Sequence, residues 1–150
     1  MNAPDIELDS LSDWLTYLET LHPQTIEMGL NRVNQVKLKL GLMPAFPVIM
    51  VGGTNGKGSV CTMLESILSC AGYKVGCYTS PHLLRYNERV RIDKKEVDDE
   101  KLCCAFGQID TARKDCQTSL TFFEFGTLAA MCVFVKAQVD VAILEVGLGG

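Results

Sequence analysis

The segment VGGTNGKGSV, residues 51–60, lies between an apolar run and a helical pattern, and this order of features limits the fold more than any other part of the chain. Before it, FPVIMVGG at 46–53 places four β-favouring residues between a proline and two glycines, which predicts a strand buried on both faces. After it, a helix is expected to end at Gly72, with an inner stripe of Val60, Met63, Leu64, Ile67 and Leu68. KVGCYTS at 74–80 predicts the next strand. The glycine-rich segment is therefore expected at the strand-to-helix junction of a βαβ unit.

Two helical patterns precede this unit. Residues 11–21 carry apolar side chains at helical spacing, and Ser10 with Asp13 resembles an N-terminal cap. MGLNRVNQVKLKLG at 28–41 predicts a second helix, because its apolar residues recur every three to four positions before the final glycine.

Two more helices and a strand are expected after the unit. Asp98 is placed to cap a helix that carries Leu102, Phe106 and Ile109, and TFFEFGTLAAMCVFVKA at 121–137 predicts a buried helix. VDVAILEVGLGG at 139–150 predicts the last strand and the start of another loop. Residues 81–99 lack a sustained period and predict a long loop with a short hairpin about Asp93 and Lys94. The predicted fold class is α/β, with a mostly parallel sheet flanked by helices.

Composition excludes several classes of protein. A chain of 150 residues with 47% hydrophobic residues is the size of one domain, and its net charge of -4, without a basic stripe, argues against nucleic acid as a partner. The longest uncharged apolar run, residues 125–135, is shorter than the roughly 20 residues that span a bilayer, so no membrane association is expected. Seven cysteines without a C-x-x-C pair predict reduced, mostly buried thiols in a cytoplasmic protein.

The chemistry of the glycine-rich segment favours a phosphate site. The common phosphate-loop pattern is G-x-x-x-x-G-K-[ST], but here Gly58 separates Lys57 from Ser59. Glycines allow backbone N–H groups to turn toward an anion at the start of a helix, and a lysine adds a mobile positive charge for the phosphates of a nucleotide. The alternative is a tight turn with an exposed lysine. The predicted strand before the loop and the helix after it favour a P-loop-type nucleotide site.

Two residues at strand ends are candidates for magnesium. Glu145 lies at the carboxyl end of the last strand, where ligands of open α/β sheets collect, although it could instead pair with a buried lysine or arginine. Ser80 ends the previous strand and offers a hydroxyl, or else caps the loop. The nearby His82 is interpreted as a loop histidine without a catalytic role.

Two further groups of residues have ordinary structural explanations. The charged residues of the long loop suit a solvated face, and they are Arg85, Glu88, Arg89 and Arg91. TFFE at 121–124 suits a helix start with Thr121 as cap and with Phe122 and Phe123 facing the core.

Taken together, the motifs resemble one ligase family. They are GTNGKGS at 53–59, TSPHLLRYNERVRI at 79–92, LTFFEFGTLAA at 120–130 and LEVGLGG at 144–150, and the likeness already begins with WLTYLETLHPQTIEMGLNRV at 14–33. In order and spacing they resemble the N-terminal part of the bifunctional dihydrofolate synthase/folylpolyglutamate synthases, members of the Mur ligase superfamily. The phosphate loop of that superfamily has the form G-T-N-G-K-G-[ST], which accounts for Gly58.

The resemblance implies an activity. The family uses ATP to phosphorylate a pterin-bearing carboxylate, and the amine of L-glutamate then displaces phosphate from this acyl phosphate. The substrates implied are dihydropteroate and (poly)glutamylated tetrahydrofolates. A Mur-type ligase acting on a UDP-sugar, and a P-loop kinase or nucleotide-binding module, are the alternatives; SPHL and TFFE argue against the first.

The resemblance also implies roles for particular residues. ATP would be held by Thr54, Asn55, Gly56, Lys57, Gly58 and Ser59, of which Lys57 is the candidate catalytic residue. Mg²⁺ would be bound by Ser80 and Glu145, and dihydropteroate by Thr121, Phe122, Phe123 and Glu124. Residues 1–150 would form the N-terminal part of a Mur-ligase-like, ATP-binding domain of a monomeric enzyme. The rest of that domain and a C-terminal glutamate-binding domain would be absent, so turnover is not expected from this chain alone.

Overall fold

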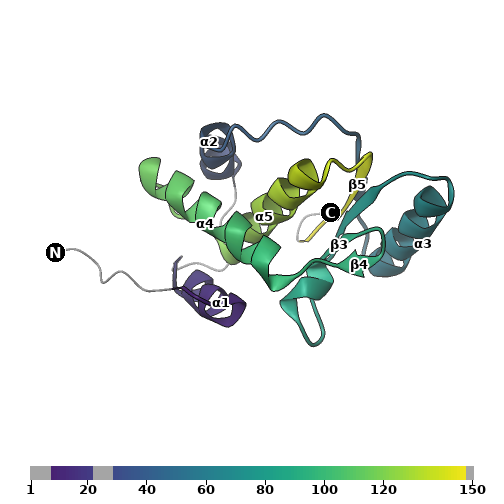
Figure 1. Ribbon diagram of the computed structural model, residues 1–150, viewed down its shortest axis with the longest axis horizontal. Helices are drawn as coiled ribbons and strands as arrows, with labels where there is room; N and C mark the ends of the chain where they lie inside the picture. Colours follow the sequence, from purple (N-terminus) through teal and green to yellow (C-terminus); the bar gives the residue numbers. More distant parts are fainter. Residues whose placement is uncertain (1–7, 22–28, 148–150) are drawn as a thin grey trace.

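The computed structural model describes residues 8–21 and 29–147, and within them a five-stranded sheet lies between helices (Figure 1). The strand order is β1-β5-β2-β3-β4. The strands are β1 (Val48–Val51), β2 (Val75–Tyr78), β3 (Val90–Ile92), β4 (Lys95–Glu96) and β5 (Val141–Glu145). β1, β5 and β2 are parallel, so their carboxyl ends lie at the same edge of the sheet. The last three residues of the predicted loop after β5, and Met28 of the predicted second helix, lie outside the described residues.

The α/β class is confirmed, but the sheet is mixed rather than mostly parallel. β3 pairs antiparallel with both β2 and β4. The physical reason is the hairpin predicted about Asp93 and Lys94, whose φ values of 49° and 66° give a two-residue turn that reverses the chain. This hairpin adds its strands to the sheet beside β2.

The helices lie where the apolar periodicity predicts them. They are α1 (Leu11–Thr20), α2 (Asn31–Lys39), α3 (Lys57–Cys70), α4 (Asp99–Asp115) and α5 (Phe122–Ala137), with a short 3₁₀ helix, η1 (Tyr86–Arg89), in the long loop. The predicted caps of α1, α4 and α5 are confirmed. The side chains of Ser10, Asp98 and Thr121 each accept a hydrogen bond from a backbone N–H of the first helical turn.

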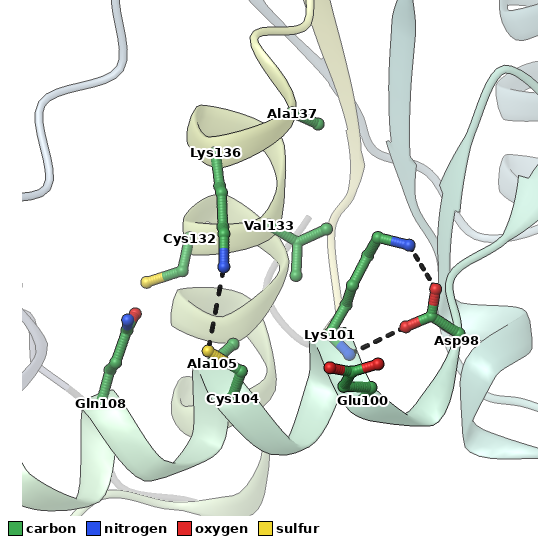
Figure 2. A pocket seen from close by; sticks show the side chains of 10 residues that line it. All are labelled: Asp98, Glu100, Lys101, Cys104, Ala105, Gln108, Cys132, Val133, Lys136 and Ala137. Atoms are coloured by element: carbon green, nitrogen blue, oxygen red, sulfur yellow. Dashed lines mark hydrogen bonds and ion pairs between the residues drawn. The ribbon is translucent and has the colours of Figure 1, made fainter.

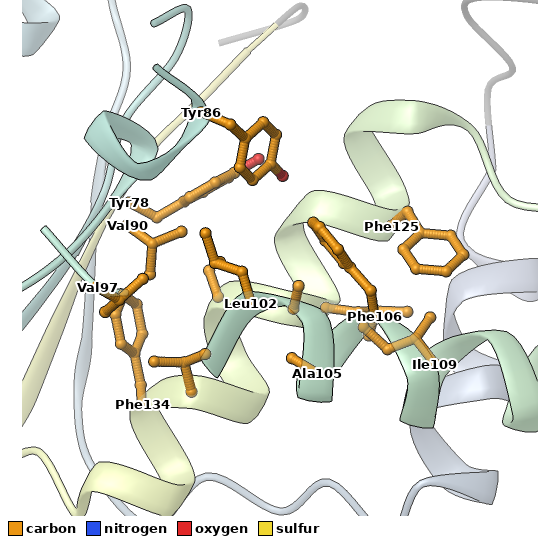
Figure 3. Packing of buried hydrophobic residues seen from close by; sticks show 14 of the residues in the cluster. Tyr78, Tyr86, Val90, Val97, Leu102, Ala105, Phe106, Ile109, Phe125 and Phe134 are labelled. Carbon is orange, nitrogen blue, oxygen red and sulfur yellow. The ribbon is translucent and has the colours of Figure 1, made fainter. Parts of the chain in front are cut away.

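The main core lies between the sheet and α4 and α5 (Figure 3). Phe106, Phe125 and Phe134 are fully buried there, and Tyr78 of β2 is 1% exposed. α5 approaches β2 closely, because a Cβ at Gly76 would lie 2.6 Å from the Phe134 ring. α1 and α2 pack against the same two helices, whereas α3 covers the opposite face of the sheet (Figure 1).

Two predictions about burial at β1 and α3 are wrong. β1 is an edge strand within the described residues, pairing only with β5, and Met50 is 68% exposed. On α3, Met63 and Ile67 of the predicted inner stripe are 64% and 62% exposed, and Val60 is also exposed. Cys61 and Glu65 are instead the buried residues of this helix. The helix is apolar on more than one face, so periodicity alone does not identify the face that contacts the sheet.

The expectation of mostly buried thiols is also wrong. All seven cysteines are free, but Cys61 and Cys77 alone are buried, while Cys70 and Cys104 are exposed on helices. Across residues 8–21 and 29–147, no helix has both the length and the apolar character that crossing a bilayer requires.

Candidate functional site

The glycine-rich loop joins β1 to α3, as the sequence predicts. Gly56 is the N-cap of α3 and has a φ of +80°, and Gly53 has a φ of +143°; both values favour glycine. In the part of the chain that the structure describes, no side-chain hydrogen bond caps α3, so the N–H groups of its first turn have no capping side chain there. This backbone can turn donors toward an anion, and the positive end of the helix dipole adds a favourable field.

Lys57 is the first residue of α3, and its side chain folds back over the loop. Its Nζ donates a 2.7 Å hydrogen bond to the carbonyl oxygen of Gly53. The neighbouring residues of the loop are exposed, namely Thr54, Asn55, Gly56, Gly58 and Ser59. The lysine is thus held next to the accessible backbone N–H groups, where it can exchange a carbonyl for a stronger anionic partner.

The ends of β2 and β5 bring Ser80 and Glu145 together. The backbone N–H of Ser80 donates to Oε2 of Glu145 at 2.8 Å, although the two residues are 65 positions apart. Glu145 is paired in register with Val51, the residue that precedes the glycines, and is 8% exposed. Both candidate metal ligands therefore lie at the same edge of the sheet as the glycine-rich loop.

The surroundings of Glu145 suit a hard cation better than a structural ion pair. No lysine or arginine forms a salt bridge with Glu145 among the residues that the structure describes. The same residues contain no cluster of three or more His, Cys, Asp or Glu side chains that would enclose a metal by itself. One carboxylate and one hydroxyl are what Mg²⁺ needs from a protein when water and phosphates supply its other ligands.

The start of α5 uses the polar atoms of Thr121 and Glu124 for its own cap. The Thr121 N–H donates to Oε2 of Glu124 at 2.9 Å, and the Glu124 N–H donates to the Thr121 hydroxyl at 3.2 Å. The other carboxylate oxygen of Glu124 accepts a 2.8 Å hydrogen bond from Arg32 of α2. Contact of these residues with dihydropteroate stays a prediction. The polar atoms that would contact this ligand already form the hydrogen bonds of the helix cap.

The two phenylalanines after Thr121 have different surroundings. Phe122 is half-buried, with its ring edge-on to Tyr86 at 5.9 Å. Phe123 is 39% exposed and lies 6.2 Å from the Tyr78 ring. Phe123 is therefore the more accessible of the two aromatic rings.

His82 and most of the charged residues of the long loop form specific hydrogen bonds and ion pairs, whereas the sequence suggested a solvated face. The Arg89 Nε donates to His82 Nδ1 at 2.8 Å, which gives this histidine a structural contact in the loop. The Glu88 carboxylate accepts hydrogen bonds from three consecutive backbone N–H groups, and these donors lower its pKa from 4.5 to about 2. Arg85 does remain on the surface, where it pairs with Glu96.

Sequence reasoning missed the partner of Arg91. The Arg91 guanidinium forms a 2.9 Å ion pair with Glu65 of α3, whose side chain is 2% exposed. The signal in the sequence is an acid four residues after Cys61, on the buried face of α3. That face cannot be identified before the packing of the helix is known.

The pocket in Figure 2 lies away from these residues. It has a volume of about 430 Å³ and lies between α4 and α5. Cys104, Cys132, Val133 and Lys136 are among the residues that line it, and none of the predicted site residues does. The candidate site is thus an open edge of the sheet rather than this pocket.

The fold and the site define an α/β protein whose candidate ligand-binding residues lie at the carboxyl ends of parallel strands, beside a glycine-rich loop. No protein-family model matches the chain. A curated relative, the dihydrofolate synthase/folylpolyglutamate synthase of Escherichia coli K12, is 55% identical over 141 residues, which are 93% of this chain and 33% of the relative. The chain matches a portion of the dihydrofolate synthase/folylpolyglutamate synthases and spans about a third of the length of this relative.

Solved structures agree with this assignment. E. coli FolC in complex with DHPP and ADP superposes with a TM-score of 0.88 at 52% identity, over 94% of this chain and 34% of FolC. A bifunctional folylpolyglutamate synthase/dihydrofolate synthase with Mn, AMPPNP and L-glutamate bound gives a TM-score of 0.86 at 54% identity, over the same shares of the two chains. The described fold is therefore that of a portion of these enzymes.

Proposed function

We propose that the chain is the N-terminal, nucleotide-binding part of an ATP-dependent ligase that joins L-glutamate to dihydropteroate and to (poly)glutamylated tetrahydrofolates. The observation that carries the proposal is the meeting of the glycine-rich loop, Ser80 and Glu145 at one edge of the sheet. The identity of 55% to a dihydrofolate synthase/folylpolyglutamate synthase supports this ligase over other enzymes with a glycine-rich loop. Related structures with ADP, AMPPNP, Mn, DHPP and L-glutamate support the choice of ligands.

In this proposal the β1–α3 loop is a P-loop-type site that binds ATP through its backbone N–H groups. The residues involved are Thr54, Asn55, Gly56, Lys57, Gly58 and Ser59. Ser80 and Glu145 hold Mg²⁺ beside the phosphates, and residues 121–124 contact the pterin. Phe123 suits a flat ring because it is partly exposed, while Thr121 and Glu124 offer polar atoms at the start of α5.

The chemistry follows from the nature of the substrates. A carboxylate is a poor electrophile, so it is first phosphorylated to an acyl phosphate, which the amine of L-glutamate then attacks. Lys57 exchanges the Gly53 carbonyl for a phosphate oxygen and offsets negative charge as the phosphoryl group moves. A bound Mg²⁺ supplies further positive charge to the phosphates. Catalysis rests on positioning and electrostatics, as in phosphoryl transfer generally.

The proposal also accounts for the apolar residues exposed around β1. Met50 is exposed on β1, the edge strand of the sheet that the structure describes, and Met63 and Ile67 are exposed on α3. We assign this surface to contact with the remaining two thirds of such an enzyme, which complete the ATP-binding domain and add the glutamate-binding domain. The complete enzyme is proposed to act on small molecules in the cytoplasm as a monomer.

A chimera tests this function. The chain replaces the matching region of the E. coli relative, and release of phosphate from ATP is measured with dihydropteroate, with L-glutamate and with both. The proposed ligase releases phosphate fully only when both the acid and the amine are present.

Other results favour the alternatives. If L-glutamate is omitted and a phosphorylated acceptor accumulates as the final product, the enzyme is a kinase. A UDP-muramoyl substrate that raises the melting temperature more than dihydropteroate does would indicate a Mur-type ligase. Absence of phosphate release in a folded chimera, beside an active E. coli parent, would contradict the proposal.

A further inference from the structure

Arg91 connects three separate parts of the structure through its guanidinium. Nε and Nη2 both donate to Oε2 of Glu65 on α3, at 3.2 and 2.9 Å. Nη1 donates to the Thr79 hydroxyl at 3.3 Å and to the Glu88 carbonyl oxygen at 3.2 Å. The planar guanidinium holds these acceptors in a fixed relative geometry, which a lysine with a single nitrogen cannot reproduce.

The three parts that Arg91 joins bear directly on the candidate site. Glu65 lies on the helix that begins at the glycine-rich loop, about two turns after Lys57. Thr79 directly precedes Ser80, whose N–H donates to Glu145. The carboxylate of Glu88 orders the backbone that follows Ser80 and His82. One side chain therefore links the phosphate-loop helix to the segment that carries the candidate metal ligand.

The buried carboxylate of Glu65 makes this link rigid. It is 2% exposed, and its second oxygen accepts a 3.1 Å hydrogen bond from the Lys94 N–H in the β3–β4 turn. A buried charge keeps its partners because losing one leaves the charge uncompensated. Glu65 thus ties α3 to the β3–β4 hairpin through both of its carboxylate oxygens.

We propose that Arg91 is a positioning residue that fixes the distance between the glycine-rich loop and the metal ligand Ser80, and so sets the affinity for Mg²⁺-nucleotide. When a group that orients a metal-ligating residue without contacting the metal is removed, the affinity for the metal changes by about tenfold to a hundredfold. The inference rests on the proposed function, because it assumes that the loop and Ser80 bind one metal-nucleotide complex.

Two variants separate positioning from simple stability. Thr79→Val removes the hydroxyl that Arg91 contacts but leaves the Arg91–Glu65 ion pair in place. Arg91→Lys keeps the positive charge near Glu65 but loses the fork that reaches Thr79 and Glu88. Thr111→Val is the matched control, because the exposed Thr111 hydroxyl donates to the Gly107 carbonyl oxygen within α4, away from Arg91.

The experiment uses the chimera with the E. coli relative, which completes the ATP-binding domain, and measures AMPPNP binding by calorimetry across a Mg²⁺ titration and in EDTA, with circular dichroism to confirm folding. Thr79→Val should raise the Mg²⁺ concentration for half-maximal binding by about threefold to tenfold, and Arg91→Lys by about tenfold or more. Binding in EDTA should be unchanged, and Thr111→Val should match the unaltered chimera throughout.

Each other outcome overturns the inference in a recognisable way. A wild-type Mg²⁺ dependence in the two folded variants would show that Arg91 has a purely structural role. Equal losses with and without Mg²⁺ would show a general effect on the loop instead of positioning of the metal ligand. Failure of the unaltered chimera to bind AMPPNP at any Mg²⁺ concentration, beside an E. coli parent that binds it, would overturn the proposed function, and this inference with it.

Discussion

The backbone N–H of Ser80 and the carboxylate of Glu145 are joined by a 2.8 Å hydrogen bond across the carboxyl ends of β2 and β5. This bond turns one oxygen of a nearly buried carboxylate toward the β2 end and fixes its position beside the glycine-rich loop. A carboxylate placed in this way, without a salt-bridge partner in the described part of the chain, is available as an oxygen ligand for a cation.

Glu145→Gln tests the metal site. The amide oxygen of glutamine can still accept the Ser80 hydrogen bond, so the fold should persist while the charge is lost. The Mg²⁺ concentration needed for AMPPNP binding should rise by about tenfold or more, and Ser80→Ala should raise it less, since a carboxylate binds a hard cation more strongly than a hydroxyl. Glu96→Gln, at a surface pair with Arg85, is the control. Unchanged Mg²⁺ dependence in Glu145→Gln would make this acid structural.

Thr121→Val tests how much the N-terminal cap of α5 contributes to stability. The capping hydrogen bond is lost, so the free energy of unfolding should fall by about 1 kcal/mol in urea denaturation. Ser10→Ala removes the corresponding cap of α1 and should cost a similar amount of stability without affecting any ligand.

The same substitution in the chimera tests the pterin assignment. With ATP and glutamate saturating, Thr121→Val and Glu124→Ala should each raise the KM for dihydropteroate by roughly tenfold and leave the KM for ATP nearly unchanged. If stability falls while both KM values stay constant, residues 121–124 only begin the helix and do not contact the pterin.

The lowered pKa of Glu88 predicts that part of the free energy of unfolding is lost at acidic pH. Hydrogen bonds from the N–H groups of residues 83, 84 and 85 lower the pKa of its carboxyl from 4.5 to about 2. A lowered pKa in the folded state adds stability above the unfolded value and loses it as the pH falls through the folded value. The stability difference between the unaltered chain and Glu88→Gln should therefore shrink as the pH is lowered from 5 toward 2. Urea unfolding at several pH values measures it, and a constant difference would contradict the assignment.

Gly76→Ala tests the close approach of α5 to β2. The added Cβ would lie 2.6 Å from the Phe134 ring, so the ring or the strand must shift, at a cost of about 1 to 3 kcal/mol in unfolding free energy. Gly107→Ala in α4 is the matched control, because its Cβ would meet Trp14 at an ordinary 3.8 Å. Equal stability of both variants would show that the Phe134 ring or β2 shifts to accept the added Cβ at little cost in free energy.

The sequence predicts which segments form helices and strands because local periodicity and capping residues decide them. Asp98 and Thr121 begin helices where expected, and Asp93 with Lys94 forms the turn of the hairpin. The order of strands is harder to predict from the sequence, since the pairing of the hairpin with β2 depends on contacts between residues that are distant in the sequence. The sequence therefore indicates the α/β class but not the mixed sheet.

Burial at the edge of the sheet is the part that local patterns miss. Met63 and Ile67 fit an inner stripe by spacing, yet they are exposed, because the sheet lies against the face of α3 that carries Cys61 and Glu65. The ion pair of Glu65 with Arg91 is hidden for the same reason: the two residues are 26 positions apart and meet only after the sheet and α3 pack. The residues of the candidate site are easier to select from the sequence, since Lys57 follows a predicted strand and Ser80 and Glu145 lie at the carboxyl ends of two others.

The central claim is that the β1–α3 loop binds the phosphates of ATP, and Lys57→Ala tests it most directly. The measurement is the Kd of Mg²⁺-AMPPNP by calorimetry for the chimera with the E. coli relative, with Lys39→Ala, at an exposed surface pair, as the control. Loss of a charge-assisted phosphate contact of about 2 to 4 kcal/mol should weaken binding by roughly 30-fold or more in Lys57→Ala, with circular dichroism unchanged and Lys39→Ala unaffected. An affinity in Lys57→Ala within about twofold of the unaltered chimera would contradict the account.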